Sequence, residues 1–472
     1  MNQQISQQAH RTQLLASGLT GDDLKNWLDA VQHATSSQPQ GLAADAKRVG
    51  DLLREGRTFF TRMPAKSERN PAERETGESL IHFISNLCRD FCRVHRVAMY
   101  EQLTDNYTQF LRLDDLAWKA AELWPGIVPS HEELELESQH FQKDKDGLEL
   151  NQGIFISQLL CEEKSGIHLL HAMLRPQPES QELLPQFIKD GRIELEHATV
   201  EVNDGAATIY LTNTRFLNAE DDLTTRDHET AIDLVLMHPG VSIGVLRGEQ
   251  VEHPRYKGRR VFSSGINLTK IYQGKMPFLM YLLRDFGLVN KLYYGLAGDT
   301  WNEDEPNNSL EKPWIGVIET FAIGGGCQLL LTMDYVLAES GSYFNLPARK
   351  EGIVPGAANL RLARFLGESV AREAIMFDRT FYVDNPESAG LVNRVVPRDK
   401  IDAALQEVVD NALGSGVVSA AGNRKVLRIG QENLEMYRRY MANYAEIQAF
   451  CHLSSQLVEN LEKHWNAKQR KL

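Results

Sequence analysis

The segment 314–330 constrains this chain more than any other, because it joins two apolar runs through three consecutive glycines. Ile and Val dominate the first run, which predicts a buried strand, and Leu329 and Leu330 after the glycines predict the first turn of a helix. Glycines let a backbone approach a ligand closely, and a helix start leaves N–H groups without intrahelical acceptors. The segment therefore predicts a backbone-amide site for an oxygen atom with negative charge, although a tight connection explains three glycines equally well.

The charge of the chain limits its partners. Its 472 residues include 51 Lys and Arg against 64 Asp and Glu, a formal net charge of −13. Such a chain has no general attraction for nucleic acid or for an anionic membrane surface. An anionic small molecule would therefore need a local cluster of basic side chains.

The cysteines and the apolar runs predict a compartment. Five cysteines are an odd number in a long chain, and residues 1–16 lack the pattern of a cleaved leader. No apolar run approaches the ~20 residues that cross a bilayer. We therefore expect a reducing, cytoplasmic location.

Changes in hydrophobic periodicity divide the chain into three predicted parts. Residues 1–190 are predicted to form an N-terminal helical domain, and a Pro-containing stretch at 176–185 marks its end. Residues 191–400 alternate strand and helix patterns, beginning with a β-hairpin at 198–212, and are predicted to form an α/β core. Residues 401–472 are predicted to be a C-terminal helical segment, which either covers the chain's own core or packs on a neighbouring subunit.

Three helices are predicted in detail. Residues 78–100 place apolar side chains at three- and four-residue spacings. The predicted stripe consists of Leu80, Ile84, Leu87, Cys88, Phe91 and Ala98. Ser130 and Glu133 have the spacing of a capping box that opens a second helix. In the C-terminal segment a helical period is kept by Leu434, Tyr437, Tyr440, Met441, Tyr444 and Ile447.

Possible metal ligands are few. Cys88, Cys92 and His95 share one face of the predicted helix, but they lie in its apolar stripe and no second pair of ligands is evident. Core packing is the predicted role of these side chains, as it is for His168 and His171. We expect no metal site, and no Gly-x-Gly-x-x-Gly follows the predicted strands to indicate a dinucleotide.

Four segments in order resemble signatures of one family. They are Phe-Ser-Ser-Gly-Ile-Asn-Leu at 262–268, Ala-Ile-Gly-Gly-Gly-Cys-Gln-Leu at 322–329, Gly-Ile-Val-Pro-Gly at 352–356 and Ser-Ala-Gly-Leu-Val-Asn-Arg-Val-Val-Pro at 388–397. Together they resemble the crotonase (enoyl-CoA hydratase/isomerase) superfamily over residues 191–400. The resemblance implies a spiral of ββα units and an acyl-CoA thioester substrate. It also implies that the N–H groups of Ile266 and Gly325 bind the thioester oxygen as an oxyanion hole, where one donor contributes roughly 3 kcal/mol.

Two positions depart from the hydratases of this superfamily. Those enzymes carry one Glu directly after the Gly-Gly-Gly-Cys and another in the segment before the Pro-Gly turn. This chain has Gln328 at the first position and Ala348 at the second. Neither side chain exchanges a proton at neutral pH, so ordinary hydration is not expected.

Both the substitutions and the helical extension are similar to those of the superfamily's cofactor-independent dioxygenases, which act on 3,5-dihydroxyphenylacetyl-CoA. That similarity implies enolate formation, electron transfer to O2, and release of 3,5-dihydroxyphenylglyoxylate and free CoA. CoA would be part of the substrate and O2 the co-substrate, with no metal or flavin as cofactor. A homotrimer or a dimer of trimers, and a place in antibiotic biosynthesis, are further implications.

The same resemblance implies roles for individual residues. Glu220, Arg284 and Gln328 would surround the dihydroxyphenyl ring, although Glu220 could instead be a helix-start carboxylate and Arg284 a surface charge. An apolar oxygen pocket would be lined by Ile266, Leu268, Ile353 and Val354, for which core packing is an equally good explanation. The residues expected to contact the substrate or CoA are Arg255, Tyr256, Ser264, Gly265, Ile266, Asn267, Leu268, Gly325, Gly326, Cys327 and Gln328.

The basic cluster at 253–260 begins with His253 and contains four cations, which could bind CoA phosphates or form a solvated loop. The four are Arg255, Lys257, Arg259 and Arg260. Two other functions stay open. One is a crotonase-type acyl-CoA hydrolase or isomerase that acts without O2, and the other is an acyl-CoA binder without catalytic activity. The residue that removes the substrate proton is not identified by the sequence.

Overall fold

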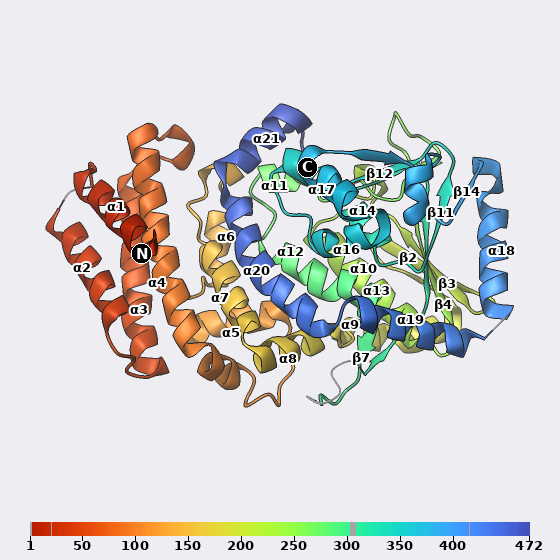
Figure 1. Cartoon of the computed structure of the whole chain (residues 1–472), viewed down its shortest axis with the longest axis horizontal. Helices are drawn as coiled ribbons and strands as arrows, with labels where there is room; N and C mark the ends of the chain where they lie inside the picture. The colour runs from red at the N-terminus through yellow and green to blue at the C-terminus, as the bar shows by residue number, and fades with distance from the viewer. Residues whose placement is uncertain (1, 20, 303–307, 415) are drawn as a thin grey trace.

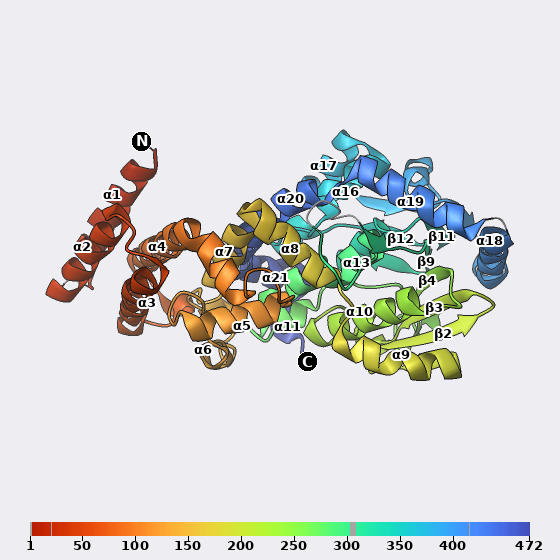
Figure 2. The ribbon, with the colours of Figure 1, turned by 90° about the horizontal axis from the view of Figure 1, so that it is seen from below.

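A computed structural model describes residues 2–19, 21–302, 308–414 and 416–472 of the chain. The helices of residues 2–103 lie at one end of the molecule in two perpendicular views, whereas the helix of residues 178–190 lies beside the large sheet (Figures 1 and 2). The described part of the first 190 residues forms helices and helical turns. They are α1 (Asn2–Ala16), α2 (Asp22–Ser36), α3 (Leu42–Thr58), α4 (Pro71–Leu103), α5 (Leu113–Leu123), α6 (His131–Glu137), α7 (Leu150–Cys161), α8 (Glu163–Leu174) and α9 (Pro178–Asp190), with the 3-10 turns η1 (Phe59–Arg62), η2 (Lys66–Glu68) and η3 (Gln142–Asp144).

The long helix α4 contains the segment predicted at 78–100 and extends beyond it at both ends. The side chain of Asn70 accepts a hydrogen bond from the Glu73 N–H in a capping box, and Pro71 occupies the first turn. The predicted apolar stripe is buried except for Ala98, which is exposed, and His95 and Met99 continue it instead. Tertiary packing therefore turns the stripe slightly away from the predicted line.

Two further predictions for the helical part concern the capping box at Ser130 and the side chains of Cys88, Cys92 and His95. Helix α6 begins after Ser130, whose hydroxyl accepts from the Glu133 N–H, so the predicted capping box is confirmed. Cys88 and Cys92 are buried in the core, and the ring of His95 lies 3.0 Å from the Asp45 carboxylate. These three side chains therefore have packing and hydrogen-bonding roles within the helical part.

Residues after α9 form the predicted α/β structure around a seven-stranded sheet. Its spatial order is β1 (Arg192–Glu194), β2 (Ala198–Asn203), β3 (Ala206–Leu211), β4 (Ile243–Gly248), β9 (Trp314–Ile318), β11 (Tyr335–Glu339) and β14 (Arg394–Val396). The predicted hairpin is confirmed, since β2 and β3 pair antiparallel with Val200 opposite Ile209. From β3 onward every neighbouring pair in the sheet is parallel.

A second, small sheet contains β10 (Phe321–Ile323), β12 (Tyr343–Asn345) and β13 (Thr380–Tyr382). The chain passes from β9 in the large sheet to β10 in the small sheet through Thr320, whose φ is +64°. This conformation is unusual for a β-branched residue, and the Thr320 hydroxyl is held by a 2.6 Å hydrogen bond to the Arg260 carbonyl. Helix α14 (Gly325–Leu330) follows β10, and the succession β11, β12 and α15 (Ala348–Glu351) repeats the arrangement. The predicted spiral of ββα units is therefore confirmed.

Further elements surround these sheets. The other helical elements of this part are α10 (Asp222–Met237), α11 (Leu268–Tyr272), α12 (Leu279–Leu283), the π-helical turn η5 (Arg284–Val289), α13 (Asn290–Tyr294), α16 (Ala358–Leu366) and α17 (Glu368–Phe377), with the 3-10 turns η4 (Thr214–Phe216) and η6 (Pro386–Gly390). Two short pairs of strands are β5 (Gln250–Val251) with β6 (Arg259–Arg260), and β7 (Leu296–Ala297) with β8 (Ser309–Leu310).

The last part of the chain is helical, as predicted. It comprises η7 (Arg398–Lys400), α18 (Ile401–Gly414), α19 (Val417–Gln431), α20 (Leu434–Leu453), α21 (Ser455–Trp465) and η8 (Ala467–Gln469). Helix α20 crosses the middle of the molecule and packs along α7 (Figures 1 and 2). Tyr437, Met441 and Tyr444 are buried there, whereas Ile447 is 51% exposed, so its predicted place in the apolar stripe is wrong.

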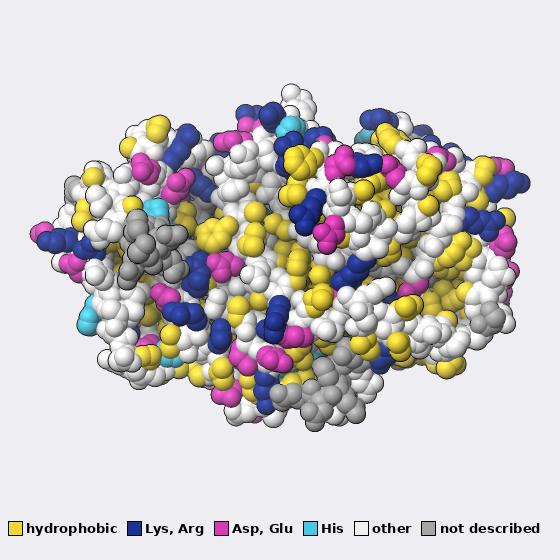
Figure 3. Space-filling view, viewed as in Figure 1, with side chains coloured by type: hydrophobic (Ala, Val, Ile, Leu, Met, Phe, Trp, Pro, Cys, Tyr) yellow, Lys and Arg dark blue, Asp and Glu magenta, His cyan; other side chains and the backbone are white. Residues whose placement is uncertain are grey.

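One hydrophobic core joins the N-terminal helices to α20 and α21, and a second fills the space around the large sheet. The C-terminal helices therefore cover the chain's own core. Boundaries at residues 190 and 400 follow the change of secondary structure, but the division into three domains stays a prediction. On the face seen in Figure 3, acidic and basic side chains are interspersed. Among the described helices, none is long and apolar enough to span a membrane.

Candidate active site

The candidate site forms where three distant segments of the chain meet. An isolated parallel bridge joins Glu220 to Ile266, with the Glu220 N–H donating to the Gly265 carbonyl at 2.8 Å. A second bridge joins Ser263 to Ala322 in β10, and the Ile323 N–H donates to the Ser263 carbonyl at 2.9 Å. These bonds hold the segment before α11 between the strand-to-helix turn of α14 and the segment that leads into α10.

The two amides predicted as an oxyanion hole are adjacent in this arrangement. Gly265 has a φ of +83°, and a Cβ atom placed on it would lie 3.3 Å from the Gly325 nitrogen. Gly325 is the first residue of α14, where a helix has no acceptor for the N–H. Within the described chain, neither this N–H nor that of Ile266 donates a backbone hydrogen bond to another residue. The described backbone thus leaves both donors without an acceptor, and their joint role as an oxyanion hole stays a prediction.

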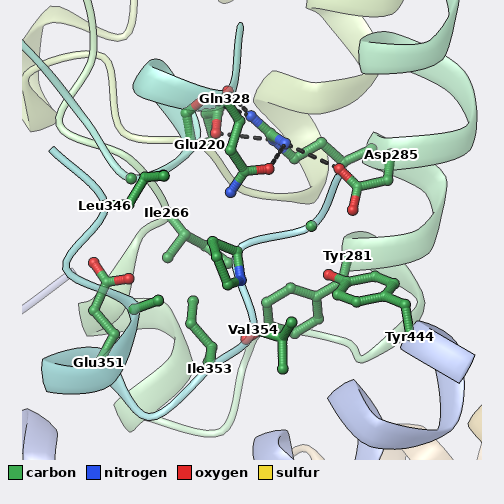
Figure 4. A pocket seen from close by; sticks show the side chains of 16 residues that line it. Glu220, Ile266, Tyr281, Asp285, Gln328, Leu346, Glu351, Ile353, Val354 and Tyr444 are labelled. Atoms are coloured by element: carbon green, nitrogen blue, oxygen red, sulfur yellow. Dashed lines mark hydrogen bonds and ion pairs between the residues drawn. The ribbon is translucent and has the colours of Figure 1, made fainter. Parts of the chain in front are cut away.

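Arg284, in η5, binds the other two groups that the resemblance assigned to the aryl ring, Glu220 and Gln328. Its Nε and Nη2 atoms donate to the two carboxylate oxygens of Glu220 at 2.9 and 3.1 Å. Its Nη1 donates to Oε1 of Gln328 at 2.9 Å and to the Asp285 carboxylate at 3.2 Å. Nη2 also donates to the Gly325 carbonyl at 2.8 Å. The guanidinium therefore fixes both side chains and the turn that carries an oxyanion donor (Figure 4).

Burial makes this cluster electrostatically unusual. Glu220, Arg284 and Asp285 are each 5% exposed or less, which excludes Arg284 as a surface charge. Burial alone would lower the pKa of Arg284, but the Glu220 and Asp285 carboxylates outweigh it and raise that pKa. Burial raises the pKa of Asp285 to about 6, although the guanidinium groups of Arg284 and Arg361 oppose the shift. Perturbed ionisable groups of this kind are frequent in active sites.

A cavity that is partly open to solvent borders the cluster and the two amides. Besides Glu220, Arg284 and Gln328, it is lined by Ile266, Tyr281, Asp285, Gly324, Gly325, Leu346, Ala348, Glu351, Ile353, Val354, Pro355, Gly356 and Tyr444. Three of the four residues expected to form an oxygen pocket are thus present here. Leu268 does not line this cavity and lies in a neighbouring groove instead.

That groove is larger, about 1350 Å³, and Ile266 lines both spaces. Arg255, Tyr256, Ser264, Asn267 and Leu268 line it, as expected for residues that contact CoA. It also contains three cations that sequence reasoning missed: Arg215, Arg470 and Lys471. Only the Lys and Arg content of the chain's last residues could have indicated two of them, because folding alone brings that end beside the groove.

Several residues expected at the site lie outside both spaces. Arg259 pairs with Glu339 and Arg260 with Glu249, each at 2.8 Å, so neither is free for a phosphate. Lys257 is exposed but does not line the groove. In α14, a Cβ on Gly326 would lie 2.7 Å from the Ser263 Cβ. The Cys327 side chain is buried in the sheet's core, where burial raises the pKa of its thiol.

Glu351 was not singled out from the sequence, yet its side chain lines the cavity and is 3% exposed. Helix α15 places it three residues after Ala348, so the two side chains share a face. Burial, and to a lesser extent the Asp378 carboxylate, raises the pKa of Glu351 to about 7. The sequence signal for Glu351 is its spacing of three residues from Ala348, the position that holds a glutamate in hydratases.

Within the described ranges, no group of three or more His, Cys, Asp and Glu side chains is arranged to hold a metal ion. The site consists instead of two backbone donors, one guanidinium, one amide and three buried carboxyl groups beside apolar walls.

Known proteins similar to this chain define its family. The profile described as Enoyl-CoA hydratase/isomerase matches residues 256–426. The (3,5-dihydroxyphenyl)acetyl-CoA 1,2-dioxygenase of Amycolatopsis orientalis is 42% identical over 412 residues, which cover 87% of this chain and 92% of that protein. A carnitinyl-CoA dehydratase of Salmonella typhi is 30% identical over 176 residues, 37% of this chain and 62% of that protein.

Among solved structures, an enoyl-CoA hydratase from Mycobacterium avium subsp. paratuberculosis K-10 has a TM-score of 0.47 and 20% sequence identity. The superposition covers 57% of this chain and 99% of that one. The chain belongs to the crotonase (enoyl-CoA hydratase/isomerase) superfamily, as the dioxygenase relative establishes over most of its length. It is accordingly an acyl-CoA enzyme of that family.

Proposed function

We propose that this enzyme is a cofactor-independent dioxygenase that converts 3,5-dihydroxyphenylacetyl-CoA and O2 to 3,5-dihydroxyphenylglyoxylate and free CoA. The observation that carries the proposal is the Arg284 cluster, in which Gln328 stands where a hydratase needs a carboxylate. The extensive identity to an Amycolatopsis orientalis dioxygenase supports the same reaction. An amide held by a guanidinium suits recognition of a phenol rather than addition of water.

The two amides and the cluster suggest how the substrate is oriented. The thioester oxygen accepts hydrogen bonds from the N–H groups of Ile266 and Gly325, and the ring points towards Glu220 and Gln328. Glu220 accepts a hydrogen bond from a phenolic hydroxyl, and the amide NH2 of Gln328 donates to the oxygen of another. Arg284 contributes by holding both side chains in place.

CoA occupies the larger groove in this proposal. Arg255 and Tyr256 lie on one loop, and Arg470 and Lys471 approach from the end of the chain. The cationic side chains of Arg255, Arg470 and Lys471 are suited to phosphate groups in a protein that is otherwise acidic. Because Ile266 lines both spaces, a thioester at this residue can extend its acyl part into the cavity and its CoA part into the groove.

The reaction needs an electron-rich carbanion. Loss of a proton from the carbon next to the thioester leaves an enolate, whose oxygen the two amides stabilise by roughly 3 kcal/mol per donor. The enolate reduces O2, and the resulting peroxide on that carbon attacks the thioester carbonyl and expels CoA. Loss of the second hydrogen as the O–O bond breaks gives the arylglyoxylate, so both oxygen atoms of O2 enter the product. Ile266, Ile353 and Val354 provide the apolar wall for O2.

Oxygen uptake tests the proposal directly. Metal-free protein mixed with 3,5-dihydroxyphenylacetyl-CoA should consume one O2 for each CoA released, and under ¹⁸O2 both labelled atoms should appear in the glyoxylate. CoA release without oxygen uptake would instead indicate a hydrolase. Binding of the thioester without any turnover would indicate an acyl-CoA binder.

We further propose that the subunit associates into trimers or pairs of trimers. Phe377 on α17 is 71% exposed, and Val426 and Leu427 on α19 are 71% and 63% exposed. Large apolar side chains at such exposure are frequent at subunit interfaces. Light scattering of the purified protein should give a mass of three or six chains, and a monomer would refute the proposal.

A further inference from the structure

We infer that Glu351 is the general base that removes the proton from the carbon next to the thioester. This inference rests on the proposed enolate chemistry and gives it a proton acceptor. Its carboxylate is buried in the cavity wall, beside the proposed oxyanion hole. The family resemblance assigns roles to the other site residues but none to Glu351.

The position of Glu351 relative to the two amides carries the inference. A Cβ atom placed on Gly324, the residue before the donor Gly325, would lie 3.7 and 3.9 Å from the two Glu351 carboxylate oxygens. Figure 4 shows Glu351 across the cavity from Glu220 and Gln328, with Ile266 between them. A substrate with its carbonyl at the amides and its ring at Glu220 therefore presents the intervening carbon towards the Glu351 side.

The other acidic groups of the cavity are already engaged. Glu220 is bound by two nitrogens of Arg284, and Asp285 by a third. Glu351 has no hydrogen bond or ion pair to any other side chain in the described part of the protein. The guanidinium takes up lone pairs of both neighbours, so Glu351 keeps more of its lone pairs for a carbon-bound proton than either of them.

The phenols at the cavity do not compete for this role. Burial raises the pKa values of Tyr281 and Tyr444 well above the usual range of a phenol, so both stay protonated at neutral pH. Glu351, whose pKa burial raises to about 7, is in contrast both ionised in part and a stronger base than an ordinary carboxylate. A pKa near the working pH is the most effective value for a general base.

Contacts with neighbouring elements also fix the short helix α15 that carries Glu351. Gly352, which ends α15, packs closely on α21: a Cβ on it would lie 2.9 Å from the Leu457 Cα. The Asn460 side chain donates to the Arg349 carbonyl at 3.0 Å. Lys350, the preceding residue, forms an ion pair with Asp378 outside the cavity. The short helix thus has neighbours that keep the carboxylate directed into the cavity.

The proton transfer balances without any further reactant. The C–H bond next to the thioester breaks, its proton moves to a Glu351 carboxylate oxygen, and its electron pair forms the carbon–carbon double bond of the enolate. The carbonyl π electrons move to oxygen, where the N–H groups of Ile266 and Gly325 hold the charge. Glu351 is then a neutral carboxylic acid, the form that its buried site favours.

Hydrogen exchange without oxygen tests this step apart from the oxygenation. The enzyme is incubated with 3,5-dihydroxyphenylacetyl-CoA in D2O under argon, and deuterium next to the thioester is measured by mass spectrometry. Wild-type protein should exchange this hydrogen, and E351Q should exchange it about 100-fold more slowly or worse. E459Q, which removes an exposed glutamate of α21, should exchange at the wild-type rate. Equilibrium dialysis under argon checks that each variant binds the thioester.

Exchange by E351Q within about threefold of wild type would overturn the inference, because general bases contribute far more than that. So would a wild-type enzyme that binds the thioester and never exchanges it. If E351Q does not bind, E351D provides the comparison, and its exchange at saturation must fall below wild type. Exchange that depends on Glu351 in an enzyme that consumes no O2 would support the base and refute the dioxygenase.

Discussion

Oε1 of Gln328 accepts a hydrogen bond of 2.9 Å from Nη1 of Arg284, in the first turn of a helix whose first N–H faces the cavity. The amide oxygen is therefore occupied, and the amide NH2 is the part of Gln328 that is left to meet a ligand. A donor directed towards the ring is complementary to a phenolic oxygen. The Arg284 contact thus determines which half of the amide the substrate meets.

Replacing Gln328 by Glu reverses that complementarity. The new carboxylate would compete with Glu220 for Arg284 and would present no donor to the ring. We expect Q328E to lower kcat/KM for oxygen uptake at least tenfold, since a buried phenolic oxygen left without its donor and facing a carboxylate costs about 1.5 kcal/mol or more. An unchanged rate of oxygen uptake would contradict the role assigned to Gln328.

Arg284 can be tested through stability. Its replacement by Met leaves the carboxylate of Glu220, which is 1% exposed, without its partner. A buried charge that loses its counterion typically costs about 3 kcal/mol or more. R284M should therefore lower the urea midpoint clearly, and the added substitution E220Q should restore part of it. As a control, R372M removes an exposed ion pair with Glu368 and should change stability by about 1 kcal/mol at most.

If R284M unfolds at the wild-type midpoint, or if E220Q adds a further loss of stability, Arg284 and Glu220 do not form the buried ion pair described.

The variant R284K separates the effect of the positive charge from that of the guanidinium geometry. Lysine keeps the positive charge but cannot bind Glu220 and Gln328 together with a planar fork. We expect it to retain more stability than R284M and still to lose oxygen uptake.

The turn before α11 provides a test of the oxyanion hole. Ala at Gly265 would have to adopt a φ of +83° and place its Cβ 2.9 Å from the Ile323 carbonyl oxygen. The chain must shift where it carries the Ile266 donor, so G265A should lower kcat about 100-fold, as loss of one oxyanion donor does. Gly298 has open space around its Cα, so G298A is the matched control and should keep full activity. Equal rates for the two variants would refute the placement of the hole.

The sequence pointed most directly to the parts of the candidate site that the backbone builds. The family resemblance pointed to Gly265 and Gly325, and the structure shows why glycine fits there: Gly265 has a positive φ, and a Cβ on Gly325 would collide with the Glu220 carboxylate. The three-glycine turn, the hairpin and the capping box at Ser130 are local features of the sequence. Ala98 and Ile447 were misplaced because the line of a helical stripe depends on which neighbour packs against it.

Residues whose role depends on distant neighbours were found less well. The basic residues at 253–260 looked equivalent in sequence, but Glu339 and Glu249 neutralise two of them from elsewhere in the fold. Arg470 lies far from that loop along the chain and beside the same groove in space. Glu351 lies three residues beyond the position that holds a hydratase glutamate, and its burial is a property of the folded chain.

The loop at 253–260 offers a paired test of CoA binding. Arg255 lines the groove, whereas Lys257, two residues away, is exposed and lies outside it. R255A should raise KM for the acyl-CoA about tenfold, because a charge-assisted hydrogen bond is worth about 1.5 kcal/mol. K257A removes the same charge and should leave KM within about twofold at physiological salt. Equal effects of both variants would indicate a general attraction by the loop instead of a built phosphate site.

The raised pKa of Glu351 predicts a dependence of stability on pH. Its pKa is about 7 in the folded protein against 4.5 in the unfolded chain, so the folded state binds the proton more tightly. The stabilisation from this group is fully present below pH 4.5 and is lost as the pH rises through about 7. E351Q has no such loss, and its free energy of unfolding relative to wild type should rise by about 3 kcal/mol between pH 4.5 and pH 8. Urea unfolding of both proteins at pH 5 and pH 8 measures most of this difference, and parallel pH curves would show that the carboxyl group ionises without cost.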